Sequence, residues 1–112
     1  MRHLVDLVEK FAIDPDAAHR ELVVNQPGFK VLHLCLKPGQ RMPLHRHPGC
    51  HVTITGLSGT ATVMLDGVAA TVAPHQLLSF DGESQVSPGN DSDGNCAVLI
   101  TLVDRQLSTA CV

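Results

Sequence analysis

The chain of 112 residues has the size of one domain built around one core, and 44% of its residues are hydrophobic. With three Phe and no Trp or Tyr, that core must be built mainly from Val, Leu, Ile and Ala. A net charge of −3 and the lack of any cluster of Lys and Arg leave no sign of a phosphate-backbone footprint, so nucleic acid is not an expected partner.

The beginning of the chain predicts one short helix. Apolar side chains recur there at helical spacing, at Leu4, Val5, Leu7, Val8 and Phe11. The pattern predicts an amphipathic helix over residues 3–12, which Asp14-Pro15-Asp16 would end. No long apolar signal region is present, and no run approaches the roughly 18 apolar residues of a membrane span. We therefore expect a soluble, cytoplasmic protein without a membrane partner.

The chain from about residue 20 to about residue 104 predicts short strands separated by turns. Runs rich in Val, Ile, Leu and Thr alternate with turn residues, and Asp66-Gly67 is the strongest hairpin signal. The expected strands are Glu21–Val24, Phe29–Leu36, Val52–Thr55, Thr60–Leu65, Val68–Val72, Gln76–Phe80, Ser84–Val86 and Cys96–Val103. Strands this short and frequent predict an all-β sandwich or barrel, with residues 1–112 forming a single domain.

Three of the seven histidines fall within seven residues, at His45, His47 and His51. In a strand, side chains two residues apart share a face, so His45 and His47 are expected to project together while Arg46 faces away. The turn at Pro48-Gly49 would bring His51 back beside them. Three imidazoles in such a set suit Zn, Fe, Mn, Ni or Cu. The alternative is a group of solvated loop histidines around a proline turn.

The spacing around these histidines resembles the first sequence motif of the cupin family. Gly39 is followed by five residues, His45-x-His47, three residues, and then His51 where the family has glutamate. The closing glycine corresponds to Gly59, one residue later than usual, and the likeness covers residues 29–103. The resemblance implies a single cupin β-barrel (a double-stranded β-helix or jelly roll), one divalent transition metal ion (Fe, Mn, Ni or Zn), a small-molecule ligand and a homodimer.

The second motif of the family is incomplete in this chain. Gly82 keeps its glycine, Phe80 replaces its proline, and Gln85 stands where the last histidine ligand belongs. Gln85 could offer its amide oxygen or hold a metal-bound water, or it could simply be a polar surface residue. His75, in an earlier turn, is a less favoured ligand. His33 alternates with apolar neighbours and is expected to be partly buried rather than a ligand.

The expected metal set is therefore His45, His47, His51 and Gln85, without a carboxylate. Neutral ligands leave the full charge of a divalent ion, which attracts anionic or chelating substrates. Arg41 or Arg46 could bind such an anion at the barrel mouth. We expect a metal-dependent, dioxygenase-like oxidoreductase acting on a small polar organic molecule, with no identifiable general base.

Two other hypotheses stay open from the sequence. One is a non-catalytic module that binds or senses a metal or a small ligand, and the other is a cupin with a decayed site that forms a structural dimer. The four cysteines, Cys35, Cys50, Cys96 and Cys111, show no Cys-x-x-Cys spacing and are expected to be free thiols rather than a disulfide framework.

Overall fold

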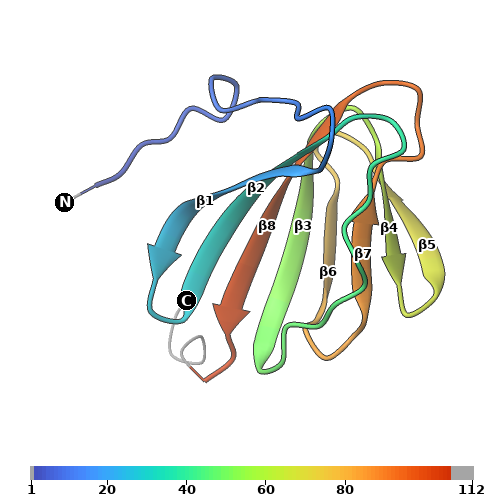
Figure 1. Cartoon of the computed structure of the whole chain (residues 1–112). Helices are drawn as coiled ribbons and strands as arrows, with labels where there is room; N and C mark the ends of the chain where they lie inside the picture. Colours follow the sequence, from blue (N-terminus) through green and yellow to red (C-terminus); the bar gives the residue numbers. More distant parts are fainter. Residues whose placement is uncertain (1, 107–112) are drawn as a thin grey trace.

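The computed structural model describes residues 2–106, which form eight β-strands and no helix (Figure 1). The strands are β1 (His19–Gln26), β2 (Phe29–Leu36), β3 (Cys50–Ser58), β4 (Ala61–Leu65), β5 (Val68–Val72), β6 (Leu77–Asp81), β7 (Val86–Gly89) and β8 (Cys96–Asp104). Two of the expected strands, β2 and β5, have the expected bounds. β7 begins later than expected and includes Pro88, whose carbonyl accepts a hydrogen bond from Met42 N at 2.8 Å.

The strands make two antiparallel sheets, with the orders β1-β2-β8-β3-β6 and β5-β4-β7. The central pair β2 and β8 runs in unbroken register, from Phe29 opposite Val103 to Leu36 opposite Cys96. The long segment between β2 and β3 lies along β7, where isolated bridges join Arg41 to Gly89 and His45 to Val86 (Figure 1). That segment holds the histidines beside the smaller sheet.

The core lies between the two sheets and is made of alternating strand residues. On β2, Leu34 and Leu36 are almost fully buried, and on β3 the same is true of Val52 and Ile54. The remaining core cluster comes from both sheets and includes Ala61, Val63, Val72, Phe80, Val86, Cys96, Val98 and Ile100. The expectation of an aliphatic core is confirmed, with Phe80 as the aromatic member of this cluster.

The other face of β2 is covered as well. His33 is 1% exposed and Cys35 is 0% exposed, although both point away from the core. The cysteine sulfur lies 4.0 Å from Nδ1 and 3.9 Å from Nε2 of His33. Cys35, Cys50 and Cys96 are free thiols, as expected, whereas Cys111 lies outside the described residues. Burial raises the pKa of Cys96 to about 11, so this thiol stays protonated.

The expected helix over residues 3–12 is wrong. The segment forms a single turn in which the Asp6 carboxylate accepts N–H bonds from Val8 at 3.0 Å and Glu9 at 3.2 Å. Leu4 is 93% exposed and Val8 is 86% exposed, whereas Val5 and Leu7 are half-buried, so the protein covers only part of the apolar side chains. A helix of this length is marginal without such packing, because nucleation is unfavourable.

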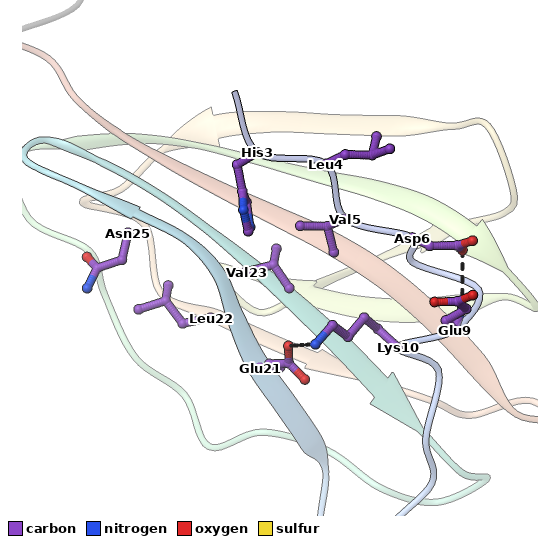
Figure 2. A pocket seen from close by; sticks show the side chains of 10 residues that line it. All are labelled: His3, Leu4, Val5, Asp6, Glu9, Lys10, Glu21, Leu22, Val23 and Asn25. Carbon is purple, nitrogen blue, oxygen red and sulfur yellow. Dashed lines mark hydrogen bonds and ion pairs between the residues drawn. The ribbon is translucent and has the colours of Figure 1, made fainter. Parts of the chain in front are cut away.

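The segment instead lies across β1, with a cavity of about 550 Å³ between them (Figure 2). An ion pair of 2.9 Å joins Lys10 to Glu21 on β1. Within residues 2–106 there is no helix that could cross a membrane.

Candidate functional site

The site is built on His45, which is fixed by its backbone. His45 N donates to Val86 O at 3.1 Å, and Val86 N donates to His45 O at 2.9 Å. Residues opposed in this way share a face of the sheet. Because Val86 belongs to the core, the imidazole of His45 faces the interior as well.

The rings of His45 and His47 lie together, with centres 4.6 Å apart and planes at 90°. His45 Nδ1 lies 2.8 Å from the carbonyl oxygen of Pro43. A carbonyl only accepts hydrogen bonds, so Nδ1 carries a proton, and in the neutral tautomer Nε2 keeps the lone pair. Burial, and then the nearby His45, lower the pKa of His47, which favours its neutral, metal-binding form.

The two rings are the candidates to hold one metal ion. Two imidazoles can share an ion when one ring nitrogen of each points to the same position, about 2.1 Å away. The distance between the centres of His45 and His47 is 4.6 Å. The bond from His45 to Pro43 O supplies the second-sphere contact that orients a ligating imidazole. Within residues 2–106, however, no group of three His, Cys, Asp or Glu side chains is placed to hold a metal.

His51 is not brought to this pair. It lies on β3 next to the core residue Val52, so its side chain points to the opposite face of the sheet. There its Nε2 lies 2.7 Å from Ser79 Oγ, and the residue is exposed. The turn at Pro48-Gly49 returns the chain, but Cys50 and not His51 takes the inward position.

Gln85 and His75 also lie apart from the pair. Gln85 is exposed next to the buried Val86, and its N–H donates to Asp66 Oδ1 at 2.9 Å. His75 is exposed in the turn between β5 and β6, and β6 starts opposite Thr55, whereas the His45–His47 pair lies near the other end of β3. His33 is buried outside the core cluster, on the far face of the large sheet.

Gly82 holds the turn that carries His47. His47 N donates to Gly82 O at 2.8 Å, and Gly82 N donates to Cys50 O at 2.9 Å. A side chain at Gly82 would collide with the carbonyl groups of His47 and Cys50. The glycine of the second motif therefore has a local role, which is to allow close approach of the histidine turn.

A cavity of about 400 Å³ opens beside His47, at the end where β2 and β3 begin and β8 ends. We call this end the mouth. The cavity is lined by Gly28, Phe29, Lys30, Arg46, His47, Pro48, Cys50, Leu102 and Asp104. Sequence reasoning missed Lys30 and Asp104, although the alternation of Lys30 with Leu32, Leu34 and Leu36 already placed the lysine on the inward face.

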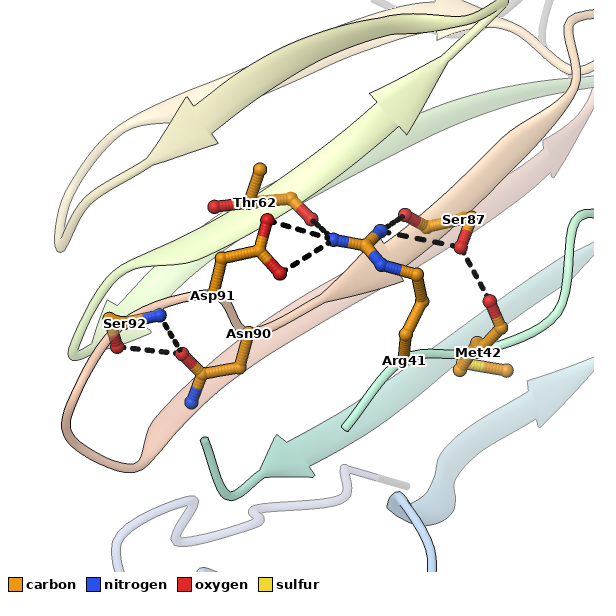
Figure 3. A network of polar contacts seen from close by, with 7 residues as sticks. All are labelled: Arg41, Met42, Thr62, Ser87, Asn90, Asp91 and Ser92. Carbon is orange, nitrogen blue, oxygen red and sulfur yellow. Dashed lines mark hydrogen bonds and ion pairs between the residues drawn. The ribbon is translucent and has the colours of Figure 1, made fainter. Parts of the chain in front are cut away.

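Arg41 does not reach the mouth. Its guanidinium donates to Ser87 O at 2.5 Å and to Thr62 O at 3.1 Å, and it pairs with Asp91 at 3.2 Å (Figure 3). The Ser87 hydroxyl donates in turn to Met42 O. Arg41 is thus a cross-link between the histidine segment, β4 and β7, which leaves Arg46 as the arginine at the cavity.

A family model described as a cupin domain matches residues 32–102. The chain belongs to the cupin family, and its first motif carries the two inward histidines. None of the curated proteins compared with the chain matches it.

Several solved structures share the fold. An RmlC-like cupin protein from Desulfovibrio desulfuricans has 23% identity and a TM-score of 0.84, with 93% of this chain and 98% of that chain covered. The cupin domain of an XRE family transcriptional regulator from Enterobacter cloacae has 18% identity and a TM-score of 0.73, covering 79% and 97%. A predicted oxalate decarboxylase from Thermotoga maritima has 15% identity and a TM-score of 0.71, covering 77% and 79%. The fold is thus similar to that of both a regulator and a predicted enzyme, and it does not choose between these functions.

Proposed function

We propose that this cupin is a metal-dependent, dioxygenase-like oxidoreductase that acts on a small polar organic molecule at the mouth. The observation that carries the proposal is the pair of inward imidazoles, His45 and His47, 4.6 Å apart beside a cavity of about 400 Å³. When bound, a divalent transition ion supplies Lewis acidity and, for iron or manganese, a redox centre.

The protein's own residues prepare this chemistry. The carbonyl of Pro43 keeps the proton of His45 on Nδ1 and so presents Nε2. Partial burial keeps His47 neutral, because its pKa is lowered by desolvation. The side chain of Leu102, which packs against the core, gives the cavity an apolar wall for a bound organic molecule. We leave His51 and Gln85 out of the proposed metal set, because they face away from the pair.

The alternative is a non-catalytic cupin that binds a small ligand or a metal. It is favoured by the small donor set, since no third His, Cys, Asp or Glu among residues 2–106 joins the two histidines. The similarity to the cupin domain of a transcriptional regulator is compatible with it. Metal content separates a metal-binding cupin from one that binds none, and turnover separates catalyst from binder.

The first test is uptake of Fe, Mn, Ni and Zn by the purified protein, measured by elemental analysis. We expect about one ion per chain in the wild type, and loss of that ion in His45→Ala and His47→Ala. His51→Ala and Gln85→Ala are matched controls that should retain it. Loss of the ion in His51→Ala but not in His47→Ala would contradict the proposed set, and a wild type that refuses all four metals would overturn metal dependence.

The second test is oxygen consumption by the metal-loaded protein with a panel of diketones, thiols and flavonols. We expect turnover that disappears in His47→Ala. Stoichiometric metal together with no turnover on the whole panel would favour the non-catalytic alternative.

A further inference from the structure

The inward face of β2 carries one charged residue. Leu32, Leu34 and Leu36 face the core, and Lys30 continues the same row at the mouth, opposite Leu102 on β8. Lys30 is exposed at the end of this row, so its charge is accessible to a ligand. None of the ion pairs formed within residues 2–106 includes Lys30. The residue lines the cavity beside His47.

A second cation lines the same cavity. Arg46 Nε donates to Glu83 O at 3.0 Å, and this bond fixes the guanidinium at the rim. Its two terminal nitrogens make no hydrogen bond within the described part of the chain. A guanidinium held in this way offers its remaining N–H groups to a planar anion.

The charge of the cavity is not balanced by the protein. Asp104 is the carboxylate that lines it, against the two cations Lys30 and Arg46. Asp104 Oδ1 already accepts the N–H of Gln106 at 2.8 Å. The apolar wall formed by Leu102 complements a short hydrocarbon body.

We propose that the mouth binds a small organic carboxylate, with its carboxylate group held by Lys30 and Arg46 and its apolar body against Leu102. The place of this ligand beside a metal rests on the proposed function, whereas the binding of the carboxylate rests on the two cations. A ligand of this class is the substrate that the cavity selects by charge.

The test compares butyrate with butyramide, which has nearly the same shape and no charge. Backbone amide shifts of the metal-free wild type are followed by NMR as each compound is added. We expect butyrate to move the signals of residues around Lys30, Arg46 and His47 and to bind at least about tenfold more tightly than butyramide. Butyrate binding should weaken as salt is added.

Substitutions then locate the site. We expect Lys30→Gln and Arg46→Gln each to weaken butyrate binding by about tenfold. Lys37→Gln, just beyond the other end of β2, is the matched control and should bind as the wild type does. Equal affinity for butyrate and butyramide, or unchanged affinity in both Lys30→Gln and Arg46→Gln, would overturn the inference. Thermal unfolding of each variant shows whether it is folded.

Metal uptake separates this inference from the proposed function. Lys30→Gln and Arg46→Gln should still take up metal, because neither side chain belongs to the histidine pair. Butyrate binding that depends on Lys30 in a protein that takes up no metal would support the carboxylate site and overturn metal dependence. Butyrate binding that requires loaded metal and is unchanged in Lys30→Gln would overturn the carboxylate site alone.

Discussion

At the level of single residues, backbone contacts decide what the site can do. His45 is turned inward by its two bonds with Val86, and its proton is placed by Pro43 O at 2.8 Å. His47 depends on its turn, which packs against a residue without a side chain, Gly82. The position of His47 therefore depends on a glycine whose missing side chain allows the close approach of the turn.

We predict that Gly82→Ala destabilises the protein and disturbs the His47 turn. The added methyl group would meet the carbonyls of His47 and Cys50, and overpacking of this kind costs about 1–3 kcal/mol. Chemical denaturation measures the change in the free energy of unfolding. Gly94→Ala is the control, because nothing lies within 4 Å of a methyl group added there. Equal stability of the two variants would show that the turn adapts freely.

At the level of elements, the segment between β2 and β3 is held by single backbone hydrogen bonds and by one side chain, Arg41, rather than by a full strand ladder. Two isolated bridges join it to β7, and Arg41 adds bonds to Ser87 O and Thr62 O (Figure 3). The ion pair of Arg41 with Asp91 contributes less, because the Asp91 side chain is 63% exposed and water screens the pair. The carbonyl bonds therefore anchor the segment that carries the histidines.

We predict that Arg41→Ala lowers the free energy of unfolding by about 2 kcal/mol, because partly buried carbonyls lose a charged donor. Asp91→Ala should lower it by less than about 1 kcal/mol. The exposed Arg20 provides a control substitution, Arg20→Ala, with an effect within about 0.5 kcal/mol. Urea titrations of the three variants give these values. An Asp91→Ala effect as large as that of Arg41→Ala would mean that the ion pair dominates.

Elements also show where local sequence patterns fail. The apolar spacing of residues 3–12 is helical, yet the segment forms one turn, because the protein covers only part of its apolar side chains. The strand patterns succeeded where alternate residues are buried, as in β3, or where both faces are covered, as in β2. A periodic pattern becomes an element only when the fold supplies a partner for its apolar face.

At the level of the whole molecule, stability depends on pH through two histidines, the buried His33 and the half-buried His47. Burial is the main cause that lowers the pKa of both His33 and His47, and it outweighs the opposite effect of Glu21 on His33. In the unfolded chain a histidine takes up a proton near pH 6.5. The contribution of His33 and His47 to the free energy of unfolding is therefore complete above about pH 6.5. It is lost as the pH falls toward the lowered pKa values of the folded protein.

We predict that the free energy of unfolding falls between about pH 7.5 and about pH 5, and that His33→Gln reduces this fall. The physical reason is that the glutamine amide takes up no proton on unfolding. Denaturation curves of the metal-free protein at several pH values measure the slope. His3→Gln, at an exposed histidine, should keep the slope of the wild type, and an unchanged slope in His33→Gln would refute the assignment.

The homodimer stays a prediction, which light scattering of the same samples can check.

The sequence by itself determined the all-β class, the family motif and the pairing of His45 with His47, because each follows from short-range alternation or spacing. Only the tertiary structure decided that His51 faces outward, that Arg41 is a cross-link, and that Lys30 lines the mouth. Those outcomes depend on which face each strand presents after a turn. One residue more or less in a turn reverses that face. The apolar pattern of a strand does not show how many residues the neighbouring turn takes up.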